Sequence, residues 1–423
     1  MEEFEEDEEN DDFDKNLIKN RKKNSSNLLK VIFIVIILTI VFFGILCYIG
    51  NTIKKKWYIV VIGDIGGKHS NLRLLNMTSN LNEEPIILKD VNHSTIEYDS
   101  LELLLKEFIS NLKDGEKPEY AIISIPGPVE NNTIITLPNI PKWKLDNGNI
   151  LAEKLGLKKL LFINDFVCNG YAIQTNLTEN KDYVILNNVK PKKDGPKLII
   201  GPGTGLGMGF LLKDPIDKYY TIGSSEGGGS DYAPKNIFNL KLREFIKDEV
   251  SLENVSLGKI CSSHSLIPIY KFLHKYNYEF NLKEFQREKN LFKKIDGFKE
   301  YKDIGQISKI NSEIINKGLS GECELSRHTL LLFIEILGEI AGDMALFTLP
   351  YNGVYLFGRL TRKLTPLILE NNIFMNHFKN KDHFWFLLEK IPVYLIQNKK
   401  IELVGVTEAA RRFLEDLEEE EET

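Results

Sequence analysis

The sequence predicts an α/β protein of two domains with a ligand cleft between them, preceded by one N-terminal transmembrane helix. Its 423 residues are enough for two such domains. From Trp57 onward, short apolar runs typical of strands alternate with segments whose apolar residues recur at helical spacing. A strand, a glycine turn and a returning strand also occur twice, at 64–67 and at 201–209. This weak internal duplication favours two facing domains, and a cleft between domains is a common ligand site.

The first series of elements begins directly after Trp57. The runs WYIVVIG, NLRLLNM and EPIILK stand at hairpin spacing and predict three strands. DSLELLLKEFISNL predicts a helix, because an Asp-Ser pair suited to capping precedes apolar residues at helical spacing. A buried strand YAIISI then ends at a Pro-Gly-Pro turn, and a helix near 150–155 leads into the strand KLLFIND.

The second series begins at KLIIGPGTGLGMGFLL, again a strand, a glycine turn and a returning strand. We expect a long helix over 326–349, the strand GVYLFG, another helix, the strand PVYLI and a last helix that contains TEAARRFLEDL. Residues 57–176 together with 400–416 are assigned to a smaller α/β domain, and 177–399 to a larger one. The acidic end, 417–423, is expected to be a solvated tail.

The N-terminal segment differs from the rest of the chain. Residues 1–30 are acidic and then basic, and we expect a disordered tail there. Residues 31–50 contain no charged side chain, and as a helix they would span about 30 Å, which matches a bilayer core. The alternatives are a cleaved signal peptide and a buried core helix, but this run is too long for the apolar core of a signal peptide. We therefore expect a single-pass membrane protein anchored in the lipid bilayer, with the side of its body undecided.

Composition excludes several classes of partner. The net charge of −6 and the lack of a basic stripe argue against nucleic acid. The four cysteines are scattered, and no Cys or His spacing is typical of zinc. We expect neither a disulfide scaffold nor a structural metal.

Three motifs could carry chemistry, and each also has a purely structural interpretation. Glycines in GPGTGLG (201–207) let backbone N–H groups approach phosphate oxygens, but a tight turn needs them equally. Asn164 and Asp165 end a buried strand, where Asn can hold sugar hydroxyls and Asp can accept a proton, but both residues also favour helix caps. SEGGGSDYAP (225–234) is either a glycine loop between two carboxylates or a flexible hairpin.

The order of these motifs resembles the bacterial-type glucokinase family, within the hexokinase and actin-like superfamily. The matching runs are VIGDIGG, SIPGPV, INDF, GPGTGLG, EGGGSDYAP, GVYLFG and PVYLI, which cover the chain from about Trp57 to Leu414. The resemblance implies an actin-like, ribonuclease H-like fold and ATP-dependent phosphorylation of glucose or a related hexose at its 6-hydroxyl. It implies Mg²⁺ with ATP as co-substrate, and it leaves a homodimer open.

The resemblance also implies residue roles. Asp165 matches the catalytic base, while Asn139, Asn164 and Glu226 match contacts to sugar hydroxyls. The residues that match the two phosphate loops are Asp64, Gly66, Gly67, Gly203, Thr204 and Gly205, with Asp64 near Mg²⁺. Phosphoryl transfer is mostly positioning plus charge neutralisation, so these parts would form the core of an active site.

The chain departs from the family pattern in the ligand loops. Where the family has Thr, Asn and then Arg after the first phosphate loop, this chain has Lys68, His69 and Asn71. Gly229 stands in place of a sugar-binding His and Arg359 in place of a Gly. Gly258 stands in place of a second sugar-binding carboxylate, with Glu253 nearby as the alternative match. Each lost hydrogen bond to a charged group costs about 1.5–3 kcal/mol.

Two hypotheses follow. The first is a membrane-anchored glucokinase that uses Asp165 as general base. The second is a catalytically impaired, membrane-tethered pseudokinase that binds a sugar or a nucleotide.

Overall fold

A computed structural model describes residues 32–43, 56–113, 115–137, 140, 142–276, 295 and 304–423. The chain divides into two compact units, Met1–Trp57 and Tyr58–Thr423. In the first unit the described residues are 32–43, which are helical, and 56–57, which are not. All the elements given a label below belong to the second unit.

The structure corrects the prediction of a transmembrane helix over 31–50. In the described part of this run, residues 32–43 are helical and span about 18 Å at about 1.5 Å per residue. In the described part of the chain no helix is both long and apolar enough to cross a membrane. Residue 31, residues 44–50 and the predicted tail over 1–30 lie outside the described residues. The predicted single-pass membrane localisation is therefore wrong.

The first sheet has five strands in the order β3-β2-β1-β4-β7. These strands are β1 (Tyr58–Ile65), β2 (His69–Met77), β3 (Ile86–Ser94), β4 (Tyr120–Ile125) and β7 (Lys159–Asn164). β2 lies antiparallel to β1 and β3, whereas β1, β4 and β7 are parallel to one another. The strands predicted in this part of the chain are confirmed, with shifted ends.

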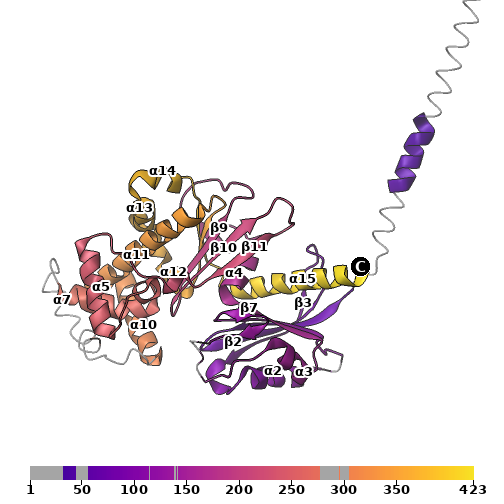
Figure 1. The fold of residues 1–423 in the computed structure, drawn as a ribbon, viewed down its shortest axis with the longest axis horizontal. Coiled ribbons are helices and arrows are strands. Elements are labelled where there is room, and N and C mark those ends of the chain that lie inside the picture. The colour runs from indigo at the N-terminus through magenta and orange to yellow at the C-terminus, as the bar shows by residue number, and fades with distance from the viewer. Residues whose placement is uncertain are drawn as a thin grey trace, which may run out of the picture. The chain divides into compact units, whose positions relative to one another are not determined.

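Helices cover both faces of the first sheet (Figure 1). α2 (Leu101–Ser110) and α3 (Gly148–Leu155) pack on one face and α15 (Ile401–Glu422) on the other. In β1, Val61 clusters with α2 while Val60 and Ile62 cluster with α15. Alternate side chains of a strand point to opposite faces, so a strand buried on both sides reads as an unbroken apolar run.

The second sheet has six strands in the order β11-β10-β9-β12-β13-β8. They are β8 (Tyr183–Ile185), β9 (Lys197–Pro202), β10 (Leu206–Lys213), β11 (Tyr220–Ser225), β12 (Val354–Leu356) and β13 (Val393–Ile396). β9 and β10 form the predicted strand, glycine turn and returning strand. A separate two-stranded hairpin consists of β5 (Val129–Glu130) and β6 (Thr133–Ile134).

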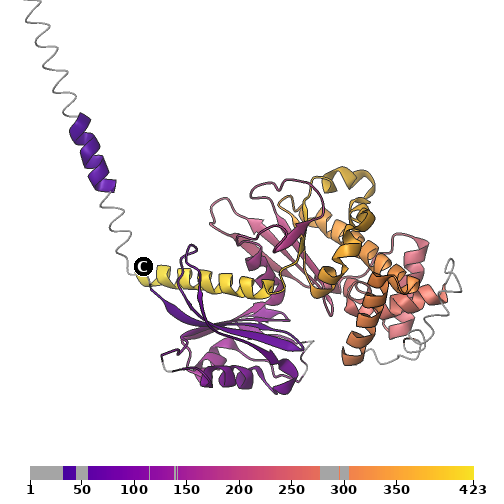
Figure 2. The same ribbon diagram turned by 180° about the vertical axis from the view of Figure 1, so that it is seen from behind.

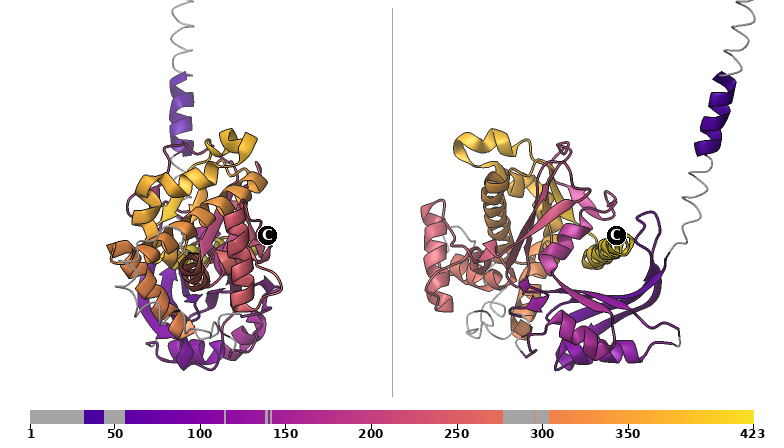
Figure 3. Two further views of the ribbon diagram at one scale, coloured as in Figure 1. Left: turned by 90° about the vertical axis from the view of Figure 1, so that its left-hand side faces the viewer. Right: turned by 45° about the vertical axis from the view of Figure 1, so that its right-hand side comes forward.

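The second sheet is also covered on both faces. α4 (Asp165–Ala172) lies against β9, β10 and β11, while α11 (Glu324–Thr348) and α12 (Arg359–Leu369) pack on the opposite side (Figure 3). The other helices that the structure describes here are α5 (Ile237–Val250), α6 (Leu257–Ile260), α7 (Leu266–Lys275), α10 (Ile304–Ser320), α13 (Ile373–Lys379) and α14 (Trp385–Leu388). The long helix predicted over 326–349 is thus confirmed as α11.

α15 links the two sheets and continues further than expected. Figure 2 shows it along the first sheet, and its first residue, Ile401, clusters with Ile199 and Ile396 of the second sheet. The segment 417–423, expected as a tail, is helical as far as Glu422. Glutamate is a good helix former, and Ser79 Oγ donates a hydrogen bond of 2.6 Å to Glu418 Oε2, which holds this end against the turn after β2.

Candidate active site

The carboxyl ends of β1, β4 and β7 meet at one edge of the first sheet. The register pairs Asp64 with Ser124 between β1 and β4, and Ile125 with Asn164 between β4 and β7. Parallel strands end on the same side of a sheet, and ligands of open α/β sheets bind there. The topology therefore brings Asp64, the Pro-Gly-Pro turn and Asp165 to a common edge.

Asn164 is the N-cap of α4. Its Oδ1 accepts hydrogen bonds from the backbone N–H of Phe166 (2.9 Å) and of Val167 (3.2 Å). Its Nδ2 donates to the carbonyl oxygen of Gly127 in the Pro-Gly-Pro turn, at 3.0 Å. The capping interpretation of this motif is confirmed, and the same bonds orient the Asn164 amide at the edge of the sheet.

Asp165 is the first residue of α4, half-buried, and its Oδ1 accepts the N–H of Phe166 at 3.0 Å. Burial raises the pKa of Asp165 to about 7, and the negative charges of Glu226 and Glu402 add to this rise, while the backbone N–H groups at the helix start oppose it. A carboxyl group that titrates near neutral pH is suited to accept a proton from an alcohol.

Two other carboxyl groups share this environment. Burial raises the pKa of Asp64 to about 7, with further contributions from the charges of Glu402 and Asp165, while a hydrogen bond from the Asn71 amide lowers it. Burial also raises the pKa of Glu402, in the first turn of α15, against the charge of Arg362. The edge therefore concentrates carboxylates whose mutual repulsion a cation would relieve.

The first glycine turn, between β1 and β2, is held by Thr95. The Thr95 N–H donates to the carbonyl oxygen of Lys68 at 3.0 Å, and its Oγ1 donates to that of Gly66 at 2.8 Å. A Cβ on Gly66 would lie 2.8 Å from the carbonyl oxygen of His69, so the turn itself requires this glycine. The Lys68 and His69 side chains are exposed.

The second glycine turn connects β9 to β10. Gly203, Thr204 and Gly205 form its exposed tip, where a Cβ on Gly205 would meet nothing within 4 Å. A Cβ on Gly207, by contrast, would lie 1.8 Å from the ring of Phe166, the neighbour of Asp165. The glycines of this motif therefore divide into some that the fold requires and some that leave room for a ligand.

The loop at 225–234 lies against the second glycine turn. A Cβ on Gly228 would lie 1.9 Å from the carbonyl oxygen of Leu206, and one on Gly258 would lie 3.2 Å from that of Gly228. Glu226 and Gly229 are exposed, and a Cβ on Gly229 would meet nothing within 4 Å. The predicted site residue Asn139 lies outside the described residues.

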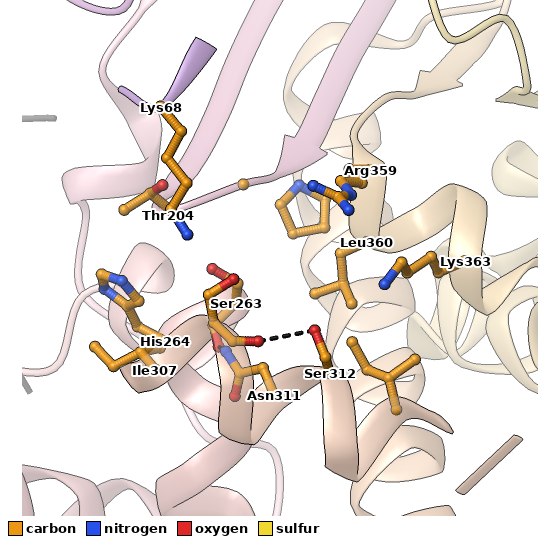
Figure 4. Close-up of a pocket in the computed structure, with 14 residues that line it drawn as sticks. Lys68, Thr204, Ser263, His264, Ile307, Asn311, Ser312, Arg359, Leu360 and Lys363 are labelled. Atoms are coloured by element: carbon orange, nitrogen blue, oxygen red, sulfur yellow. Dashed lines mark hydrogen bonds between the residues drawn. The ribbon is translucent and has the colours of Figure 1, made fainter. Parts of the chain in front are cut away.

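A pocket of about 290 Å³ opens beside the second glycine turn (Figure 4). It is lined by Lys68, Pro202, Gly203, Thr204, Ser263, His264, Ile307, Ser308, Asn311, Ser312, Ile315, Arg359, Leu360 and Lys363. β9 and β12 are parallel, with Leu356 paired to Ile200, so the turns that follow these strands lie together and place Arg359 near Thr204. The pocket combines cations and an apolar wall, and none of the described residues that line it is acidic.

Sequence reasoning missed Thr95, Glu402 and Lys363. Thr95 follows an edge strand, and Glu402 and Lys363 stand in ordinary amphipathic helices. No local motif marks any of them. They reach the site because of strand register and helix packing.

Comparison with known proteins agrees with this architecture. The family profile described as Glucokinase matches residues 61–413. The glucokinase of Trichormus variabilis is 33% identical over 357 residues, 84% of this chain and 99% of that protein. The glucokinase of Synechocystis is 30% identical over 357 residues, 82% of this chain and 96% of that protein.

Solved structures show the same fold. A glucokinase from an Antarctic psychrotroph matches with a TM-score of 0.65 at 22% identity, over 84% of this chain and 99% of that one. A glucokinase from Balamuthia mandrillaris in complex with glucose matches with a TM-score of 0.63 at 16% identity, over 85% and 95%. The second unit is therefore an α/β sugar kinase fold. The chain belongs to the glucokinase family, whose members are hexokinase-type phosphotransferases.

Proposed function

We propose that the protein phosphorylates glucose or a related hexose at its 6-hydroxyl with ATP, and that Asp165 is the general base. Membership of the glucokinase family supports the reaction class. The observation that carries the assignment to this residue is the raised pKa of Asp165, to about 7, at the edge where β1, β4 and β7 end.

In the proposed reaction the sugar 6-oxygen attacks the γ-phosphorus while its proton passes to a carboxylate oxygen of Asp165. A new phosphorus–oxygen bond forms, the bond to the β–γ bridging oxygen breaks, and ADP leaves. Asn164, Glu226 and Asn139 would hold the sugar hydroxyls. Asn164 suits this role because its Nδ2 already has one hydrogen bond to Gly127, and an amide nitrogen has a second N–H to donate.

Gly203, Thr204 and Gly205 would receive the phosphates of ATP, as would Gly66 and Gly67 of the first turn. The exposed, uncrowded tip of the second turn supports this role. Residues 57–176 with 400–416 and residues 177–399 would be the two domains that close on the substrates.

Mg²⁺ fits the acidic edge as a companion of ATP. Among the described residues no group of three or more His, Cys, Asp or Glu is placed to hold a metal by itself. Mg²⁺ needs fewer protein ligands, because it keeps several waters and binds through one or two carboxylates plus phosphates. Asp64, whose pKa is raised by burial and by Glu402 and Asp165, is the carboxylate that would hold it. The ion would neutralise phosphate charge.

The test is the release of ADP by the full chain with Mg-ATP and a panel of hexoses, followed by NMR of the product to locate the phosphate. We expect a sugar 6-phosphate from the wild type and a strong loss of turnover in Asp165→Asn. Absence of sugar-dependent ADP release, or turnover that the substitution leaves unchanged, overturns the proposal.

The second candidate is a protein that binds a sugar or a nucleotide without catalysis. Gly229 and Gly258 favour it, since neither can supply the side-chain hydrogen bond that the family resemblance implies at its position. Heat-shift measurements with glucose and ATP on a chain that shows no turnover would support this candidate.

A further inference from the structure

Three cationic side chains converge on the pocket beside the second glycine turn. Figure 4 shows Lys68 and Thr204 on one side of it, and Arg359 and Lys363 on the other. Within the described residues none of these three cations has an ion pair, and the lining contains no aspartate or glutamate. Cations gathered without a protein counter-ion repel one another, and a bound anion would relieve this repulsion.

The backbone that carries these cations is well defined. Lys68 lies in the turn that Thr95 holds through the Lys68 carbonyl oxygen at 3.0 Å. Arg359 is the first residue of α12, a helix of 11 residues, and Lys363 stands one turn later on the same helix. The positive end of α12 therefore adds to the charge at the Arg359 side of the pocket.

The three cations come from two parts of the second unit. Lys68 follows β1 of the first sheet, whereas every other residue that lines the pocket comes from position 202 or later. A long anion held by Lys68 and Arg359 together would connect the two sheets. A single small anion would contact the cations on only one side of such a pocket.

The geometry points to Lys68, Arg359 and Lys363 as the residues that hold the polyphosphate chain of the phosphoryl donor. This inference rests on the proposed function, because it concerns the donor end of the same site. Lys68 and Arg359 stand where the resemblance implies a threonine and a glycine, so this chain replaces neutral contacts by charged ones rather than losing the site. Ile307, Ile315 and Leu360 supply the apolar wall against which the base of a nucleoside diphosphate or triphosphate would pack.

This arrangement predicts that affinity follows phosphate number. The binding of ADP, AMP and inorganic tripolyphosphate to the full chain, without sugar, is measured by calorimetry. We expect Lys68→Thr and Arg359→Gly, which introduce the residues that the resemblance implies, each to weaken ADP and tripolyphosphate by about 10-fold. The effect on AMP should be smaller, and Lys68→Arg should retain most of the affinity because it keeps the charge.

Lys309→Met is the matched control, because Lys309 is an exposed lysine of α10 that does not line the pocket. We expect it to bind ADP as the wild type does, and all variants to keep the denaturation midpoint of the wild type. Binding by Lys68→Thr that equals or exceeds that of the wild type overturns the inference, as does equal weakening in Lys309→Met. Since no sugar is present, ADP binding that persists in a chain without sugar phosphorylation would refute the proposed function and leave this inference standing.

Discussion

Asp165→Asn should remove activity and, at the same time, stabilise the unliganded protein. The substitution keeps the shape of the side chain and an oxygen that can accept the N–H of Phe166, now 3.0 Å from Oδ1. It removes a carboxylate whose ionisation is opposed by burial and by the charges of Glu226 and Glu402. Catalysis needs that carboxylate, whereas folding without substrate is better served by a neutral group.

The expected magnitudes follow from the raised pKa. A general base contributes about 10²–10⁴-fold to a rate, so turnover should fall by about that factor. The pKa of Asp165 rises from 3.8 to about 7 on folding. Without screening, this shift would lower the free energy of unfolding above pH 7 by about 4 kcal/mol. Asp165 is only half-buried, so we expect solvent screening to reduce this contribution to about 1–2 kcal/mol.

The sign of the pH dependence is defined by the direction of the shift. A carboxyl group with a raised pKa in the fold favours folding while it is protonated, below pH about 4. This contribution is lost as the pH rises to about 7, because the unfolded chain ionises first. The free energy of unfolding of Asp165→Asn, relative to the wild type, should therefore rise between pH 5 and pH 8.

The assay is chemical unfolding of the full chain at several pH values, combined with sugar-dependent ADP release. Asp214→Asn is the matched control, since Asp214 is exposed and its Oδ1 accepts the N–H of Ile216, a bond that Asn can keep. The control should change neither turnover nor the pH dependence. A stability difference for Asp165→Asn that is the same at pH 5 and pH 8 would refute the electrostatic reasoning. Turnover within about 10-fold of the wild type would refute the role as base.

Three further substitutions test other parts of the fold and site. Gly405→Ala places a Cβ 2.1 Å from the carbonyl oxygen of Cys168, where α15 crosses α4. This clash should lower the free energy of unfolding by about 1–3 kcal/mol. An unchanged denaturation midpoint would contradict this close crossing. Thr95→Val removes the hydroxyl that holds the first glycine turn. It should raise the KM for ATP about 10-fold with a smaller change in kcat. A lower denaturation midpoint with an unchanged KM would mean that Thr95 acts only in folding. Gly229→His is sterically possible, because a Cβ at this position would meet nothing within 4 Å. The substitution should add a contact to the sugar and lower the KM for glucose about 10-fold. A KM for glucose that stays the same or rises counts against a sugar site at this loop.

Several predictions from the sequence depended on local signals and were confirmed. The strand runs, the two glycine turns and the long helix at 326–349 are marked by apolar period, glycine and capping residues within a few positions of each other. The apolar run at 31–50 had an equally strong local signal, but the described helix covers only 32–43. Residue 31 and residues 44–50 lie outside the described residues, and no described helix is both long and apolar enough to cross a membrane.

Other features could not be predicted, because they arise where distant segments meet. Thr95 reaches the first turn through the register of β2 with β3, and Glu402 reaches Asp64 because α15 packs on the first sheet. Arg359 and Thr204 line the same pocket because β12 pairs with β9 in parallel. The positions of Thr95 and Arg359 depend on strand pairing and that of Glu402 on helix packing, and no window of sequence contains either.

The sequence by itself determined the elements, the family and the chemical types that surround the site: a carboxylate after one strand and glycine turns after two others. Only the tertiary structure decided which charged side chains lie close together and which of them are buried. Burial beside Glu226 and Glu402 moves the pKa of Asp165 to about 7, and strand order gathers Lys68, Arg359 and Lys363 around one pocket. The physical reason is that propensity and turn chemistry act within a few residues, whereas desolvation and Coulomb interactions depend on distances that exist only after the chain has folded.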